Sequence, residues 1–220
     1  MNLSTDTLSV LKNFSDINQN LLIKPGNKVQ TISTMKNILA EAEVSEKFES
    51  EFAIYDLPEF LRSVELFDKP ELKFNGGGYV NISKGNSRGI KYFFADKSVI
   101  VSPSKGINMP DKHVTFTLKK NDFTDLMKGA TTLNLPDISV VGKGGSISMV
   151  ATDKKNKSSN TYSVNVGETD KEFTAFFRTE NFKQIVDDYD VAISKAKISH
   201  FVNRNKSVQY WIALEPDSEF

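Results

Sequence analysis

The sequence repeats one pattern in its two halves: a short amphipathic helix followed by short runs of alternating apolar and polar residues. The stretch LSVLKNFSDINQNLLI begins at Leu8, and a looser version of it, FTDLMKGATTLNLPDISV, begins at Phe123. The halves correspond at an offset of about 116 to 123 residues, so that Lys12 falls on Lys128 and GIKYFFA falls on SVQYWIA. This repetition predicts two similar domains rather than one large domain.

Four segments show the apolar spacing that is typical of amphipathic helices. The first covers residues 4–17 with Ser4 as its N-cap, and the second covers 56–67 with Asp56 as its N-cap and a proline in the first turn. The third covers 121–133 and the fourth covers 179–189. The residues expected to be buried are Leu8, Leu11 and Phe14; Leu57, Phe60, Leu61 and Val64; Phe123, Leu126, Met127 and Ala130; and Phe182, Ile185, Val186 and Tyr189.

Short runs rich in Phe, Val, Ile and Thr fill the remaining sequence and predict strands. They include KVQTIS, YVNIS, GIKYFFA and KSVIV before residue 102, and VTFTL, SISMVA, TYSVNV and SVQYWIAL after it. Turn signals such as KPGNK, GKGGS and KGNSRG separate them. Residues 101–113, VSPSKGINMPDKH, carry two prolines and a glycine and indicate an extended connector. The pattern predicts an α+β protein with domains at 1–100 and 114–220.

Composition excludes several classes of protein. The 28 Lys plus Arg residues balance the 28 Asp plus Glu residues, so no bulk positive charge indicates a nucleic-acid partner. The absence of cysteine excludes disulfides and thiolate zinc sites. No signal peptide is recognisable, and no apolar run approaches the roughly 18 residues of a membrane span. We therefore expect a soluble intracellular protein.

Catalytic motifs are missing from the sequence. His113 and His200 are the only histidines, and we expect both to be structural or solvated. Neither FNGGGY nor GKGGS has the spacing of a phosphate-binding loop. No nucleophile, general base, cofactor site or metal site is indicated, so we expect a binding protein rather than an enzyme.

Each predicted helix carries one basic residue on or near its exposed face: Lys12, Arg62, Lys128 and Lys183 in turn. Together these residues could attract phosphate weakly. A single exposed lysine on a helix is ordinarily no more than solvated surface, and the four helices together are slightly acidic.

Three stretches, Leu3 to Asn18, Ala53 to Leu61 and ALEPDS at 213–218, occur together with the order of elements described above. In these features the sequence resembles a known family, the replication sliding clamps of large tailed bacteriophages, which are relatives of proliferating cell nuclear antigen. The resemblance extends along the whole chain but is sparse between residues 69 and 101. These motifs are structural, so their joint order carries the specificity.

The resemblance implies two clamp domains, each of antiparallel sheets with two helices, that assemble as a homotrimeric ring. The helices would line the hole and the sheets would form the outer shell. The implied activity is to encircle duplex DNA without sequence specificity and to tether the replicative DNA polymerase, after an ATP-dependent clamp loader has placed the ring. Service in late transcription, a location in the host cytoplasm, no membrane partner and no cofactor or metal are also implied. Encirclement needs only weak phosphate contacts, which a neutral chain can supply.

The resemblance also assigns roles to residues of this chain. The hole would be lined by Lys12, Arg62, Lys128 and Lys183. Subunits would meet through edge strands near Tyr92, Val99, Thr161 and Val164. Partner peptides would enter an apolar pocket between the domains, bordered by Ile107, Met109, Pro110, Leu214 and Pro216.

Two other classes remain open at the level of sequence. A non-enzymatic phage structural β protein would share the β-rich, cysteine-free composition. A small hydrolase on a β scaffold would need a convergent site that the sequence does not display.

Overall fold

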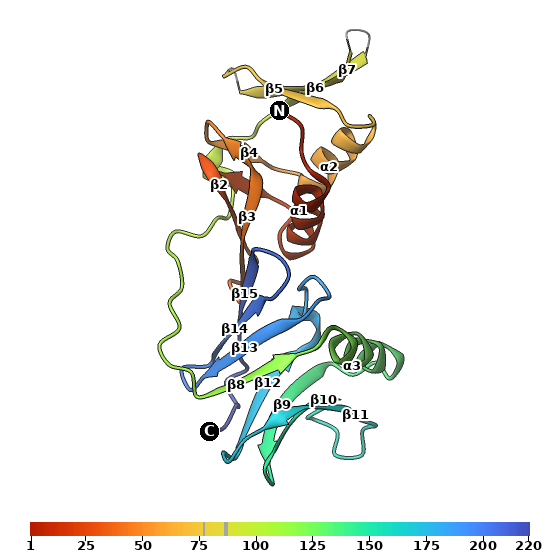
Figure 1. Cartoon of the computed structure of the whole chain (residues 1–220), viewed down its shortest axis with the longest axis vertical. Helices are drawn as coiled ribbons and strands as arrows, with labels where there is room; N and C mark the ends of the chain where they lie inside the picture. Colours follow the sequence, from red (N-terminus) through yellow and green to blue (C-terminus); the bar gives the residue numbers. More distant parts are fainter. Residues whose placement is uncertain (77, 86–87) are drawn as a thin grey trace. The chain divides into compact units, whose positions relative to one another are not determined.

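A computed structural model describes residues 1–76, 78–85 and 88–220 of the protein (Figure 1). The chain divides into two compact units, residues 1–106 (unit 1) and 107–220 (unit 2). The division falls inside the segment 101–113, which contains no helix or strand. The predicted turn KGNSRG includes residues 86 and 87, and the stretch FNGGGY includes residue 77; these three positions lie outside the described residues.

Unit 1 contains two α-helices, as the sequence predicts. They are α1 (Thr5–Ile17) and α2 (Leu57–Glu65), which lie side by side in Figure 1. The strands are β1 (Leu21–Ile23), β2 (Gly26–Ile32), β3 (Ile38–Phe48), β4 (Phe52–Ile54), β5 (Glu71–Phe74), β6 (Tyr79–Lys84) and β7 (Arg88–Phe93). Antiparallel pairing joins β1 with β4 and β2 with β3, and forms the sheet β5-β6-β7.

The predicted N-caps hold both helices of unit 1. Ser4 Oγ accepts the N–H of Thr7 at 3.1 Å, and Asp56 Oδ1 accepts the N–H of Glu59 at 2.7 Å. Each cap satisfies one of the backbone donors that a helix start leaves unpaired. The predicted apolar stripes are buried, except that Leu8 is only half-buried.

Unit 2 contains two antiparallel sheets and one α-helix, α3 (Lys120–Thr132). One sheet has the order β11-β10-β9-β12, and the strands β15-β14-β13-β8 are neighbours in the other. Their bounds are β8 (Val114–Leu118), β9 (Asp137–Lys143), β10 (Ser146–Thr152), β11 (Tyr162–Glu168), β12 (Phe173–Arg178), β13 (Tyr189–Ser194), β14 (Ile198–Asn203) and β15 (Val208–Ala213). Edge-to-face contacts among Phe123, Phe182, Tyr189 and Phe201 fill the core.

The fourth predicted helix is wrong: residues 179–181 form a single 3-10 turn, η2, and the chain then runs irregularly to β13. Hydrogen bonds with tyrosine hydroxyls take the place of the backbone hydrogen bonds that a helix would form. The N–H of Ile185 donates to the Tyr210 hydroxyl at 3.3 Å, and the Ile185 carbonyl accepts from the Tyr189 hydroxyl at 2.6 Å. The carboxylate of Asp188, which would oppose the dipole at a helix C-terminus, instead accepts the N–H of Lys120 at 2.7 Å and caps α3.

Three more burial predictions differ from the structure. Val186, expected in the core, is 44% exposed, and Ile185, also expected there, is half-buried, because their segment is not helical. Met127 is half-buried rather than buried, although Phe123, Leu126 and Ala130 are buried as predicted.

The predicted strand KSVIV is also wrong. Lys97–Val99 form a 3-10 helix, η1, started by Asp96, whose carboxylate accepts the N–H of Ser98 at 2.8 Å. This local capping competes with strand geometry. Conversely, β3 and β5 were not predicted as strands.

Candidate functional site

The helix lysines and arginine predicted from the sequence differ in their surroundings. Lys12 on α1, Arg62 on α2 and Lys128 on α3 are exposed. Lys12 Nζ forms an ion pair with Glu65 Oε1 on α2 at 2.7 Å. Arg62 and Lys128 form no ion pair with the described residues. These two cations are therefore the ones left to attract an anion from outside.

Lys183 does not lie on a helix, contrary to the prediction, and its role toward DNA stays a prediction. It follows η2 rather than lying on a helix, and it is half-buried. Its N–H donates to the Asn181 carbonyl at 3.0 Å. The missing helix removes the geometric reason for placing Lys183 on an exposed helical face.

Tyr92, the residue of β7 predicted to lie at the subunit interface, does not turn its backbone groups to the free edge of the sheet. Phe94, directly after β7, donates its N–H to the Gly78 carbonyl at 2.8 Å, so its backbone faces β6. Backbone groups of successive strand residues point to opposite sides, so Tyr92 also faces β6. Lys91 and Phe93 turn their N–H and C=O groups to the outer edge of the sheet.

The side chain of Tyr92 is half-buried and packs against α2. Its ring lies 5.2 Å from that of Phe60, and its hydroxyl donates to the Asp56 carbonyl at 3.2 Å. Burial, with the nearby charges of Glu59 and Asp56, raises the pKa of Tyr92 to about 12. Val99 lies in η1 rather than in a strand, so it offers no ladder hydrogen bonds.

The edge strand β11 gives a similar result. Thr161 directly precedes β11, and Val164 lies opposite Met149 of β10. The pair Lys143 and Ser146 closes the two-residue hairpin loop between β9 and β10, so alternation turns the backbone of Met149 toward β11. Val164 therefore faces β10, and Ser163 is the residue whose backbone groups point to the free edge.

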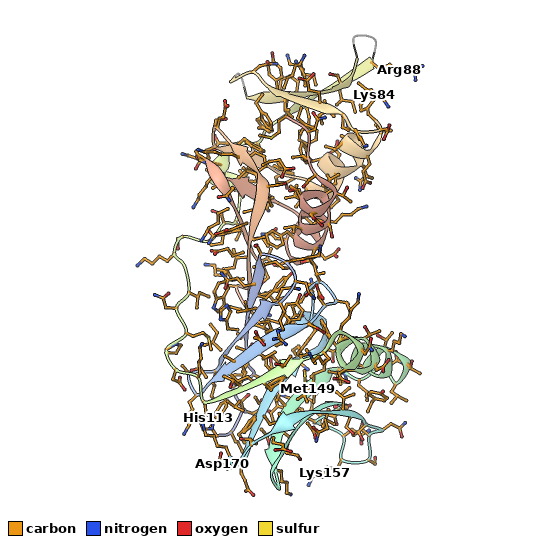
Figure 2. All side chains as sticks on the ribbon, viewed as in Figure 1. Lys84, Arg88, His113, Met149, Lys157 and Asp170 are labelled. Carbon is orange, nitrogen blue, oxygen red and sulfur yellow. The ribbon has the colours of Figure 1, made fainter. Side chains whose placement is uncertain are left out.

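Exposed aromatic side chains lie on the outer face of β6 and β7, near the free edge of β7 in unit 1. Phe93 is 65% exposed, its ring lies 5.7 Å from that of Tyr79, and Lys91 Nζ lies 4.0 Å above the Tyr79 ring. The hairpin ends at Lys84 and Arg88, which are partners in register (Figure 2). The period-2 pattern of GIKYFF could have indicated this exposed face from the sequence.

The residues predicted to border a partner pocket all belong to unit 2. Leu214 is buried, Ile107 and Met109 are half-buried, and Pro110 and Pro216 are exposed. Lys197 holds the C-terminal pair: its carbonyl accepts the N–H of Leu214 at 2.9 Å, and its Nζ donates to the Pro216 carbonyl. That these five side chains form one pocket stays a prediction.

An aromatic pair on β14 and β15 was not predicted as part of any site. His200 and Trp211 are opposite each other in register, and their rings stack with centroids 4.5 Å apart. They lie on the sheet face opposite to that of Phe201 and Tyr210, which pack in the core. The indole Nε1 of Trp211 is buried without a hydrogen-bond partner among the described residues.

The two histidines have structural contacts. His200 Nε2 lies 2.8 Å from Gln209 Oε1. His113, labelled in Figure 2, makes edge-to-face contacts with Phe173 and Phe220. Burial, together with the positive charges of Lys195 and Lys171, lowers the pKa of His113. Across the part of the chain that the structure describes, no acidic or histidine cluster could hold a metal, and no helix is long and apolar enough to cross a membrane.

Both halves of the chain match families of one kind. Residues 4–102 match the DNA polymerase processivity factor family, and residues 115–216 match the gp45 sliding clamp, C-terminal family. The sliding clamp of Vibrio phage KVP40 is 35% identical over 98% of this chain and 99% of its own length. The chain belongs to the sliding clamp family.

Other clamps agree with this assignment. The sliding clamp of Escherichia phage RB69 is 31% identical over 99% of this chain and 98% of its own length. The clamp fold is shared with proliferating cell nuclear antigen from Thermococcus kodakaraensis: the TM-score is 0.71 at 14% identity, over 98% of this chain and 99% of that one. The chain is thus a sliding clamp and DNA polymerase processivity factor, and the alternative of a phage structural β protein is set aside.

Proposed function

We propose that three copies of this clamp form a closed ring around duplex DNA and tether the replicative DNA polymerase without catalysing a reaction. Units 1 and 2 are then the two clamp domains, with residues 101–113 as connector. The match of both halves to processivity-factor and sliding-clamp families carries the proposal. A trimer, an ATP-dependent loader, a role in late transcription and a location in the host cytoplasm follow from the same likeness.

Weak DNA contact fits the charges that we find on the helices. Arg62 and Lys128 are exposed and without an ion pair among the described residues, whereas Lys12 shares its charge with Glu65. Strong phosphate binding would require many cations. A ring that encloses its DNA needs few of them, because retention comes from topology rather than affinity.

For the subunit contact we propose that β7 of one copy pairs with β11 of the next. Both are outermost strands of their sheets, and unpaired strand edges are templates for a further strand. Lys91 and Phe93 on β7, and Ser163 on β11, supply the outward backbone groups.

For the partner contact we propose an apolar surface of unit 2 that includes Ile107, Met109, Pro110, Leu214 and Pro216. A half-buried Met beside prolines can adapt to more than one peptide. Polymerase and loader peptides would insert apolar anchors there.

Native mass measurement combined with primer extension tests the proposal. We expect a species of about 74 kDa, three copies of the 24.6 kDa chain. We also expect longer polymerase products in the presence of the clamp and its loader. A monomer at working concentrations, with product lengths unchanged, would reject the proposed ring.

A further inference from the structure

The two units differ at one edge of a corresponding sheet. In unit 2, the strand β8 pairs along β13 through five residue pairs, from Tyr189 opposite Leu118 to Ile193 opposite Val114. In unit 1, no described strand pairs with the outer edge of β5. The N-terminus lies at that edge in Figure 1, where the Leu72 N–H donates to the Met1 carbonyl at 2.7 Å and the Met1 ammonium donates to the Leu72 carbonyl at 3.0 Å. Among the described residues, the outer edge of β5 is therefore paired only at Leu72, whereas the corresponding edge of β13 is paired along five residues.

The strand registers identify the unpaired position at the outer edge of β5. The strands β5, β6 and β7 correspond to β13, β14 and β15, since GIKYFFA falls on SVQYWIA. Following the pairs Tyr92–Val80–Phe74 and Tyr210–Phe201–Val191 across the two sheets makes Phe74 equivalent to Val191. The residue opposite Val191 is Phe116 of β8, and its side chain is buried. Opposite Phe74 no residue is paired among those described.

The backbone N–H and C=O of Phe74 point to the unpaired side of β5. Leu72 bonds Met1 on the outer side, so alternation turns the N–H and C=O of Phe74 outward as well. An extended chain added here would place one side chain on the same face as the Phe74 ring.

A cavity of about 660 Å³ lies on that face of β5. Its lining includes the buried side chains of Phe48, Phe52 and Leu72 and the half-buried ring of Phe74. The Phe52 ring lies 5.6 Å from that of Phe48 and 5.0 Å from that of Phe74. This apolar, aromatic lining suits a side chain like that of Phe116 in the equivalent place of unit 2.

Three residues that carry a charge line the cavity: Met1 with its N-terminal ammonium, Lys73 and Glu49. The ammonium donates to the Leu72 carbonyl and Lys73 pairs with Glu71 at 3.3 Å, whereas Glu49 is exposed and forms no ion pair with the described residues. Ser50 and Gly76 also line the cavity, so the Glu49 loop lies beyond the Phe74 end of β5. An antiparallel segment would begin at that end, and its N-terminal residue would meet Glu49. In unit 2, Lys112 lies two positions before Val114, the first residue of β8.

We propose that the edge of β5 is a second docking site, separate from the partner surface of unit 2. It takes an extended segment of a partner protein that has a basic residue followed by two apolar side chains two positions apart, the second aromatic. The segment adds a strand antiparallel to β5, its aromatic side chain enters the cavity, and its basic residue pairs with Glu49. The segment KHVTFT, residues 112–117, which consists of the two residues before β8 and the first four residues of β8, has this chemistry.

Fluorescence anisotropy with a labelled KHVTFT peptide and the full-length clamp, without DNA, tests the site. We expect saturable binding that weakens at least tenfold when the peptide carries Asn in place of its Val and Phe. Glu49→Lys should weaken it severalfold, and Ser50→Trp, which fills the cavity mouth from an exposed position, at least tenfold. The matched control is Glu172→Lys, an exposed acid of unit 2 that lies between β11 and β12 and forms no ion pair with the described residues, and it should have no effect.

Three results of the binding assay would overturn the proposal. They are no saturable binding up to millimolar peptide, equal binding of the Asn peptide, or binding that neither Glu49→Lys nor Ser50→Trp changes. A wild-type clamp whose native mass exceeds that of Ser50→Trp would assign the edge to a second copy of this chain and reject a foreign segment. Because the assay uses neither DNA nor polymerase, its failure leaves the proposed ring unaffected.

Discussion

Lys12 on α1 and Glu65 on α2 form an ion pair at 2.7 Å, between two helices whose exposed faces we assign to DNA. Both side chains are well exposed, so the pair contributes about 0–1 kcal/mol to stability. The pair matters more for DNA binding than for stability, because Glu65 neutralises one of the few helix cations that could bind phosphate.

Charge changes at the helices should alter DNA binding and leave the fold intact. The double variant Lys12→Glu with Lys128→Glu should weaken loading and sliding on circular DNA, and it should flatten the dependence of DNA affinity on salt, since each lost phosphate contact removes about 0.9 from the log–log slope. Glu65→Gln should have the opposite effect by freeing Lys12.

The matched control reverses the charge of one exposed strand lysine in each unit, Lys47→Glu with Lys143→Glu. That variant should retain processivity. Equal losses in both double variants would mean that overall charge, rather than the helix faces, governs DNA binding.

Proline in the outward backbone positions should separate the subunits. Lys91→Pro and Ser163→Pro each remove an edge N–H without removing a ladder bond within the sheet, so folded monomers should result. Lys91→Ala and Ser163→Ala keep the N–H and should remain trimeric. Sedimentation velocity measures the outcome, and trimers from both proline variants would place the interface elsewhere.

Truncation of the connector side chains should weaken peptide binding alone. Ile107→Ala with Met109→Ala should cost about 1 kcal/mol or more per anchor in affinity for a polymerase-tail peptide. Trp211, the chain's single tryptophan, offers an intrinsic fluorescence readout within unit 2. The trimer and its sliding on preloaded DNA should persist, and a double variant that binds the peptide like wild type would move the site.

Glu46 on β3 should make the stability of unit 1 depend on acid pH. Burial raises the pKa of Glu46, but hydrogen bonds from the Thr7 hydroxyl and the Ser4 N–H outweigh it and lower the pKa below its ordinary value of 4.5. Its contribution is therefore present above pH 4.5 and is lost as pH falls through the lowered folded-state pKa.

Glu46→Gln should reduce the free energy of unfolding at pH 7 by about 1 kcal/mol, because a neutral acceptor replaces a charged one. Denaturant unfolding at pH 7 and pH 3 measures this. The difference between wild type and variant should shrink at pH 3, and a constant difference would exclude the carboxylate as its source.

Local signals explain which elements the sequence predicted. Ser4 and Asp56 cap their own helices, so both helix starts were readable. The cap of α3 comes from Asp188, 68 residues away in sequence, and no local pattern reveals such a partner. Hydrogen bonds of the Ile185 backbone with side-chain hydroxyls keep residues 182–188 from forming the helix that their apolar spacing favours: its N–H donates to the Tyr210 hydroxyl, 25 residues away, and its carbonyl accepts from the nearby Tyr189 hydroxyl.

The strand β3 and the outward positions of the edge strands were harder to predict. In β3, buried Ala40, Ala42 and Val44 alternate with charged or polar residues, a period-2 signal that the helix-favouring Ala and Glu obscured. The sequence marked β7 as an edge strand but chose Tyr92. Only the register shows that Lys91 and Phe93 turn their backbone groups outward.

Release of loaded clamp from DNA on linearisation tests the central claim most directly. Labelled clamp is placed by its loader on a nicked circular duplex, washed at high salt and then treated with a restriction enzyme that cuts the circle once. A ring held by topology resists the salt wash and leaves within minutes of cutting. A clamp that washes off the intact circle, or that stays bound to the linear product without end blocks, would contradict encirclement.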